Sequence, residues 1–165
     1  MGLKMSSSIA IASGKGGVGK TTIAVNLSLT LCQMGSKVSL MDADFGLANA
    51  HILLGINPKR TIRDLLKNEL PLEDIIESGP SGLKFISGGN GLIDILNIEK
   101  NSKYQLIRAL DPIQKNTDYL LVDIPAGASD NSMTFASAVD KLIIVLVSEP
   151  TSFMDAYTFI KTAKL

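Results

Sequence analysis

A short segment near the N-terminus, Ser13–Thr22 (SGKGGVGKTT), combines glycines, lysines and hydroxyl side chains at spacings that suit phosphate binding. Residues Gly14–Thr21 fit the pattern G-x-x-x-x-G-K-[ST]. Glycines let backbone N–H groups turn inward around phosphate oxygens, where a β-carbon would block them. Lys20 can reach the β- and γ-phosphates, and the Thr21 hydroxyl is a hard oxygen ligand suited to Mg²⁺. The segment therefore predicts a loop that binds the phosphates of a nucleotide.

The elements on either side of this loop have the order that phosphate binding requires. Ser8–Ala12 (SIAIA) is a short apolar run typical of a strand, and Gly19–Met34 has the period of a helix that is apolar on two faces. A helix that begins near Gly19 adds its partial positive charge to the site, and Thr22 is placed to touch the α-phosphate. A chance glycine-rich turn is the alternative. The predicted phosphate-binding residues are Gly14, Lys15, Gly16, Gly17, Val18, Gly19, Lys20, Thr21 and Thr22.

Two aspartates follow the next predicted strand. Lys37–Met41 (KVSLM) leads into Asp42 and Asp44, which face one side together if the chain remains extended. Two carboxylates beside a triphosphate fit a site for Mg²⁺ or for an ordered water. The alternative is that one of them caps the short helix predicted over Leu47–Leu54.

A third aspartate ends a later strand. Tyr119–Val122 is a continuous apolar run followed by Asp123, the usual form of a Walker B strand, so we expect Asp123 to hold Mg²⁺ through water. Ile124–Gly127 (IPAG) follows, and the alternative for it is a turn that needs Pro and Gly anyway. Because ligands of open α/β sheets bind at the carboxyl ends of parallel strands, we expect all of these loops to converge there.

Composition narrows the class of protein. The chain has 165 residues, with 16 Lys+Arg, 16 Asp+Glu, one Cys and 45% apolar residues, which favours one domain. These values exclude a disordered charged tail and a disulfide scaffold, and they give no strong signal for nucleic-acid binding. The apolar runs are far below the ~20 residues that span a bilayer, and Met1–Ser8 lacks a signal-peptide core. We expect a reduced, cytoplasmic protein.

Short apolar runs alternate with helical patterns along the chain, which predicts an α/β fold with an open, mostly parallel, twisted sheet and helices on both faces. Further strands are predicted at Leu83–Ser87 and Leu142–Val147, giving about five. Short helices are predicted near Ile62–Leu66 and Leu72–Ile76, and a longer one at Lys103–Gln114.

The sequence also predicts how the last strand and the last helix are placed in the fold. The strand Leu142–Val147 should have an exposed edge unless another segment covers it. The final helix, Phe153–Leu165, should pack against the sheet as a crossover helix does, and a helix that binds a membrane or a partner is the alternative. The stripe that we expect it to bury consists of Phe153, Ala156, Tyr157, Ile160 and Ala163.

The segment Lys15–Thr22 (KGGVGKTT) resembles the deviant Walker A motif of MinD/ParA-type ATPases. In that family the signature lysine reaches across a dimer to the partner's nucleotide, so the resemblance implies that Lys15 neutralises phosphate charge in trans. A solvated loop lysine is the alternative. The resemblance also implies ATP and Mg²⁺ as ligands, a homodimer through bound ATP, and the strand order 3-2-4-1-5 for the five predicted strands.

Further roles follow from the same resemblance. Met41–Asn49 (MDADFGLAN) is similar to the family's second motif, in which Asp44 would orient the attacking water and Asp42 would support the metal shell. Gly127 would offer its N–H to the γ-phosphate, as in the family's switch II. The implied catalytic residues are Lys15, Lys20 and Asp44, and the implied metal site comprises Thr21, Asp42 and Asp123.

Longer strings are similar to the FlhG/FleN branch, the MinD-like regulators of flagellar number and placement. They are Met41–Gly55, Thr61–Ile76, Gly82–Gly91 and Asp123–Lys161, although Asp123–Gly127 (DIPAG) looks more like MinD. The resemblance implies a slowly hydrolysing ATPase switch whose partners are a GTPase or regulators of flagellar placement. Two alternatives remain open: a ParA-like DNA-partition ATPase, and a non-hydrolysing nucleotide-binding module that acts through protein contacts.

The family domain continues beyond the segment matched here. We therefore expect residues 1–165 to form a single P-loop ATPase domain that is truncated at its C-terminal end, with weak hydrolysis. In the family, the missing part carries a base-recognising Asn and an amphipathic membrane-targeting helix. Peripheral contact with the inner face of the membrane would depend on that helix. His51 and Cys32 are expected to have structural roles.

Overall fold

The computed structural model describes residues 6–46, 48–66, 70–89, 108 and 111–163. Its described strands form one six-stranded sheet in the order β3-β4-β2-β5-β1-β6. The strands are parallel, except that β3 runs antiparallel to β4. Their bounds are β1 Ser7–Ala12, β2 Val38–Asp42, β3 Ile76–Ser78, β4 Lys84–Ile86, β5 Tyr119–Asp123 and β6 Lys141–Ile144.

The five predicted strands correspond to β1, β2, β4, β5 and β6, and their predicted order is confirmed. The short strand β3 was not predicted. The helix expected over Leu72–Ile76 is instead a 3₁₀ turn, η1 (Leu72–Ile75), which leads directly into β3. The chain then reverses through η2 (Pro80–Gly82), where the Gly79 N–H donates to the Leu83 carbonyl, and pairs Ile76 with Ile86. A three-residue strand is too short to show a period in sequence.

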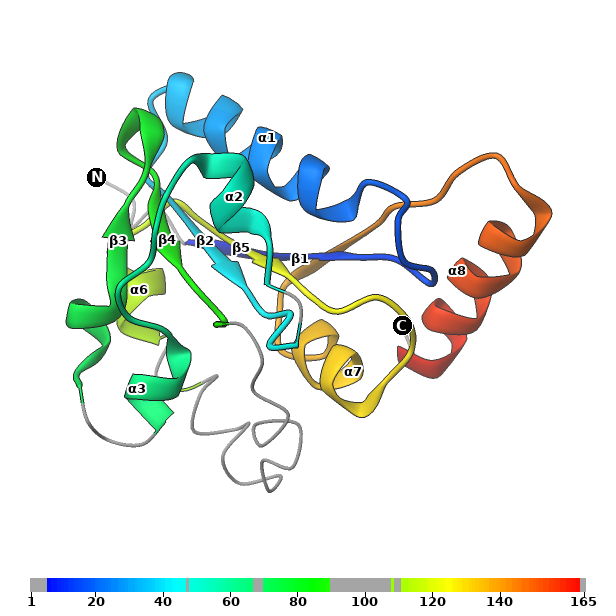
Figure 1. Ribbon diagram of the computed structural model, residues 1–165. Helices are drawn as coiled ribbons and strands as arrows, with labels where there is room; N and C mark the ends of the chain where they lie inside the picture. The colour runs from blue at the N-terminus through cyan, green and yellow to red at the C-terminus, as the bar shows by residue number, and fades with distance from the viewer. Residues whose placement is uncertain (1–5, 47, 67–69, 90–107, 109–110, 164–165) are drawn as a thin grey trace.

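Helices cover both faces of the sheet, as predicted (Figure 1). Alternate side chains of β1 enter two separate cores, because Ala10 and Ala12 belong to one apolar cluster and Ile11 to the other. The α-helices are α1 Lys20–Gln33, α2 Ala50–Leu54, α3 Ile62–Leu66, α6 Asp111–Lys115, α7 Asp130–Ala136 and α8 Pro150–Ala163.

Two described helices, α6 and α7, differ from the sequence prediction. Most of the helix predicted at Lys103–Gln114 lies outside the described residues, and α6 covers its end, with Pro112 near the start of the helix where proline is tolerated. The unpredicted helix α7 follows Asp123 and begins with a cap, since the Ser129 Oγ accepts a hydrogen bond from the Ser132 N–H.

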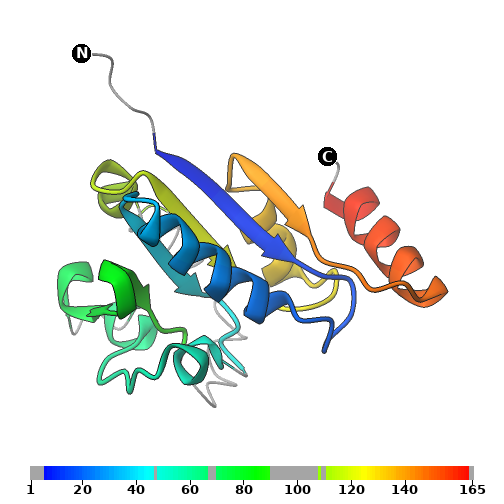
Figure 2. The ribbon, with the colours of Figure 1, turned by 90° about the horizontal axis from the view of Figure 1, so that it is seen from above.

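The buried stripe predicted for α8 is wrong at Phe153, Tyr157 and Ile160 and right at Ala156. The helix buries Ser152, Ala156 and Phe159, whereas Phe153, Tyr157 and Ile160 are 54%, 60% and 42% exposed. Phe159 packs in the same apolar cluster as Phe135 of α7. The face of α8 that points into the protein is therefore not the face with the most apolar side chains. Figures 1 and 2 show α8 beside β6 and α7 rather than over the middle of the sheet. Among the described strands, β6 pairs with β1 alone and forms an edge of the sheet, as expected for the last predicted strand.

Candidate functional site

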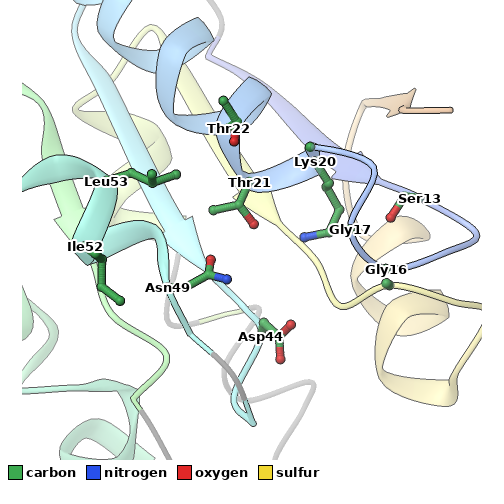
Figure 3. Close-up of a pocket in the computed structure, with 12 residues that line it drawn as sticks. Ser13, Gly16, Gly17, Lys20, Thr21, Thr22, Asp44, Asn49, Ile52 and Leu53 are labelled. Carbon is green, nitrogen blue, oxygen red and sulfur yellow. The ribbon is translucent and has the colours of Figure 1, made fainter. Parts of the chain in front are cut away.

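A pocket of about 560 Å³ lies where the loops after β1, β2 and β5 meet, at the carboxyl ends of these strands (Figure 3). The predicted convergence of the loops is therefore observed. Its volume is in the range of small-molecule sites. The lining residues are Ser13, Gly16, Gly17, Gly19, Lys20, Thr21, Thr22, Asp44, Asn49, Ile52, Leu53 and Ala126.

The glycine-rich loop has the backbone that its sequence requires. Gly17 and Gly19 have φ values of 77° and 89°, which residues with a β-carbon rarely adopt. Gly19 is also the N-cap of α1 and supplies no side-chain hydrogen bond to the first turn. The first N–H groups of α1 thus remain available to an anion in the pocket, where the helix dipole favours negative charge.

Lys20 and Asp123 form a buried ion pair directly behind the pocket. Lys20 Nζ lies 2.5 Å from Asp123 Oδ1, and both side chains are almost fully buried. The other carboxylate oxygen, Asp123 Oδ2, is buried without a hydrogen-bond partner among the described residues. An orphaned buried carboxylate oxygen fits a nearby cation or its water, so Asp123 suits the predicted Mg²⁺ role. The pair joins the first residue of α1 to the last residue of β5.

The Asp42 carboxylate accepts hydrogen bonds from backbone N–H groups. Its Oδ1 accepts a hydrogen bond from the Asp44 N–H, and its Oδ2 accepts from the Asn49 and Ala50 N–H groups at the start of α2. Asp42 is not the N-cap of α2, which is Asn49, but its carboxylate accepts hydrogen bonds from the first N–H groups of that helix. Burial raises the pKa of Asp42 to about 6, and the charge of Asp123, its register partner on β5, acts in the same direction. Its predicted place in the metal shell stays a prediction.

The Lys20, Thr21 and Asp44 side chains lie around the same space in the pocket (Figure 3). Asp44 is half-buried, as expected of a group that meets both protein and solvent. Within the described residues, no cluster of three or more His, Cys, Asp or Glu side chains could hold a metal ion. A Mg²⁺ ion would rely on the Thr21 hydroxyl, on water and on phosphate oxygens, which is a common arrangement for this ion.

A backbone hydrogen bond joins the loop after β5 to the loop after β1. Gly127 has a φ of 83°, and its N–H donates to the Ser13 carbonyl at 2.8 Å. This is the N–H predicted to meet the γ-phosphate, so it would have to leave Ser13 to do so. The adjacent Ala126 lines the pocket.

Four of the predicted phosphate-binding residues do not line the pocket: Gly14, Lys15, Val18 and Gly127. Lys15 points instead to Glu149, with its Nζ 3.0 Å from Oε2. Val18 packs against one of the two cores. Conversely, Ile52, Leu53 and Ala126 line the pocket but were not predicted, because apolar residues near a pocket look like ordinary core residues in sequence. Asn49 stood within the Met41–Asn49 motif but was given no role.

Within the residues that the structure describes, no helix combines the length and the apolar composition needed to cross a bilayer.

Comparison with protein families places the fold and the site in a known group. Residues 4–164 match the ParA family model, described as NUBPL iron-transfer P-loop NTPase. The chain belongs to the ParA family of P-loop NTPases. This assignment agrees with the MinD/ParA resemblance of the phosphate loop and accounts for the order of the parallel strands.

Members of the ParA family with curated names extend the comparison. The antiactivator FleN of Pseudomonas aeruginosa is 41% identical over 153 residues, covering 93% of this chain and 55% of FleN. The flagellum site-determining protein YlxH of Helicobacter pylori is 36% identical over 165 residues, covering 93% of this chain and 52% of YlxH. This chain thus spans about half the length of these relatives.

A solved structure supports the same fold. The septum site-determining protein MinD of Pyrococcus horikoshii, solved as a complex with Mg-ADP, superposes with a TM-score of 0.82 at 30% identity. The superposition covers 98% of this chain and 67% of that MinD.

Proposed function

We propose that this ParA-family chain is a Mg²⁺-dependent ATP-binding switch that hydrolyses ATP slowly and dimerises around two nucleotides. The observation that carries the proposal is the buried pair of Lys20 and Asp123 behind the pocket, in which Asp123 Oδ2 has no hydrogen-bond partner among the described residues. A triphosphate with Mg²⁺ brings anionic oxygens for Lys20 and a hydrated cation for Asp123. Both buried charges would then be satisfied by one ligand.

The reaction is the transfer of the γ-phosphoryl group to water, in which positioning and charge neutralisation dominate. Lys20 and the open N-terminus of α1 would neutralise the β- and γ-phosphate oxygens. Asp44, which lines the pocket, would orient the attacking water. The Thr21 hydroxyl and, through water, Asp123 would hold Mg²⁺, which would supply further neutralisation of the same oxygens. Asp42 would act on this site by fixing the loop that carries Asp44.

Lys15 is the residue proposed to act across the dimer. Its side chain is 47% exposed and lies outside the pocket of its own chain. A lysine in that position is free of its own nucleotide and accessible to a second copy. In the dimer, its ammonium would neutralise phosphate charge in trans.

We further propose that the output is spatial: the placement or number of flagella, through a partner GTPase or a regulator protein. The support is the similarity to FleN and YlxH, an antiactivator and a flagellum site-determining protein. The test is to replace Lys20 by Ala in the gene of the source organism and to record the number and positions of its flagella by electron microscopy. An unchanged number and placement would contradict this output.

The biochemical test is binding of ATP, GTP and ADP with Mg²⁺ at several chain concentrations, with the molar mass measured alongside. We expect ATP to bind, to shift the chain to a dimer and to be hydrolysed faster than by Lys20→Ala. Asp44→Ala should bind ATP normally but lose turnover. If Asp44→Ala kept full turnover, its assignment to the water would be wrong.

The two alternatives predict different outcomes of the same test. Binding without phosphate release above the Lys20→Ala level would indicate the non-hydrolysing module. ATP-dependent binding to DNA of any sequence, weakened by salt, would indicate the DNA-partition ATPase.

A further inference from the structure

The signature lysine is held within its own chain by a residue that is 134 positions away in sequence. Lys15 Nζ donates to Glu149 Oε2 at 3.0 Å, and the two side chains are 47% and 57% exposed. Glu149 stands directly before α8, and its carbonyl accepts a hydrogen bond from the Phe153 N–H in the first turn of that helix. The ion pair therefore joins the phosphate loop to the start of α8.

The neighbouring residue in the loop rests on the same helix. A β-carbon placed on Gly14 would lie 2.4 Å from the carbonyl carbon of Asp155, so only glycine fits this approach. Ser13, just before it, binds the Lys15 carbonyl through its hydroxyl and accepts the Gly127 N–H at its own carbonyl. The loop segment around Lys15 is thus tied to α8 on one side and to the loop after β5 on the other.

We propose that Glu149 is a positioning residue for Lys15, which holds the ammonium on its own chain and competes with the phosphates of a second copy for it. The inference rests on the proposed function, because it assumes that Lys15 acts in trans. The Glu149 carboxylate and a phosphate of another subunit are both anions, so they repel each other when they share the Lys15 ammonium. Dimerisation around nucleotide would therefore weaken the contact that ties the loop to the start of α8.

The size of the effect follows from the exposure of the pair. Exposed ion pairs change an equilibrium by about two- to five-fold, and salt screens them. Glu149 is therefore expected to adjust the chain concentration at which the dimer forms rather than to prevent it.

The first experiment tests the contact without nucleotide. Glu149→Gln keeps the shape of the side chain and removes its charge, and Glu73→Gln is a matched control, because Glu73 is exposed on η1 away from the pocket. Each protein is treated with a limiting amount of an amine-acetylating reagent, and modification of Lys15 is measured by mass spectrometry. We expect about two-fold faster modification in Glu149→Gln than in the wild type and in Glu73→Gln. Equal rates in all three would overturn the proposal.

The second experiment tests the competition. Sedimentation with Mg-ATP gives the chain concentration at which half of the protein is dimeric. We expect this concentration to be about two- to five-fold lower for Glu149→Gln than for the wild type at low salt, and the difference to vanish near 1 M salt. Glu73→Gln should match the wild type at every salt concentration.

The outcomes separate the two proposals. A wild-type dimer that Glu149→Gln leaves unchanged overturns the competition alone. A wild-type dimer that Glu149→Gln weakens means that Glu149 acts across the dimer, and this also overturns it. If neither protein dimerises although both bind ATP, the proposed dimeric switch is wrong and the competition falls with it, while the acetylation result still decides whether Glu149 holds Lys15.

Discussion

At the residue scale, the buried pair of Lys20 and Asp123 serves both the fold and the site. Removal of one partner from a buried ion pair leaves an uncompensated charge, which typically costs about 3–5 kcal/mol. Lys20→Ala should therefore lower the free energy of unfolding by about 3 kcal/mol, besides weakening nucleotide binding. Urea denaturation measures this directly. Lys20→Ala combined with Asp123→Asn should recover part of the loss, and no recovery would argue against a stabilising pair.

Asp42 should give the protein a characteristic dependence on pH. Burial raises its pKa from 3.8 to about 6. Between these two values the folded chain binds more protons than the unfolded chain, so the contribution of Asp42 to stability falls as pH rises from about 4 to about 6. Asp42→Asn should remove this pH dependence, which amounts to about 3 kcal/mol for a shift of roughly two pKa units at 1.36 kcal/mol per unit.

The measurement for Asp42 is the difference in unfolding free energy between the wild type and Asp42→Asn at several pH values from 4 to 7. Taking the difference removes the titration of other groups, such as Asp140, whose pKa is lowered mainly by the hydrogen bond from the Ser8 N–H. A difference that does not vary with pH would contradict the assignment.

At the element scale, the approach of the phosphate loop to α8 depends on Gly14. Because a β-carbon there would collide with the backbone of Asp155, Gly14→Ala should destabilise the protein by about 1–3 kcal/mol. Gly16→Ala is the matched control in the same loop, since a β-carbon at Gly16 has no atom within 4 Å and should change stability by less than about 0.5 kcal/mol. Thermal unfolding compares the two, and equal effects would mean that the loop does not rest on α8.

The orientation of α8 makes a second prediction at this scale. Phe159 is fully buried, whereas Phe153 is 54% exposed. Phe159→Ala should lower the free energy of unfolding by about 3–5 kcal/mol, and Phe153→Ala should change it by less than about 0.5 kcal/mol. Chemical denaturation of both variants checks the face of the helix. A larger loss of stability in Phe153→Ala than in Phe159→Ala would mean that α8 buries the stripe predicted from sequence.

The same helix shows why some features were accessible from sequence and others were not. The phosphate loop was predictable because its chemistry lies in one contiguous segment between a strand and a helix. A helical period identifies an apolar stripe but not whether the chain buries it, so α8 was placed on the wrong face. The strand β3 is too short to carry a period at all.

Sequence motifs could not predict contacts between residues that are distant in the chain. Asp42 was predicted near the nucleotide, yet its hydrogen bonds to Asn49 and Ala50 depend on the path of the intervening loop. The pairing of Lys15 with Glu149 depends on the whole sheet, since it joins segments that follow β1 and β6. Sequence indicates which residues carry chemistry, and the fold decides which of them meet.

At the scale of the whole molecule, the sheet separates two cores and places the pocket at one end of its central strands. β1 carries the phosphate loop and lies next to the edge strand β6. Beyond it, the outward side of α8 exposes Phe153, Met154, Tyr157 and Ile160. The loop after β1 therefore also contacts the helix that follows the edge strand.

The burial of Lys20 has a consequence for the evolution of the fold. Its ammonium has already lost most of its water in the folded chain, so a phosphate would exchange one anionic partner for another. Well-packed apolar residues in place of a buried pair often leave a protein equally stable or more stable. Selection for stability alone would therefore tend to replace Lys20 and Asp123 together by apolar residues. Their presence indicates that the chain retains a less stable arrangement because the pair serves ligand binding.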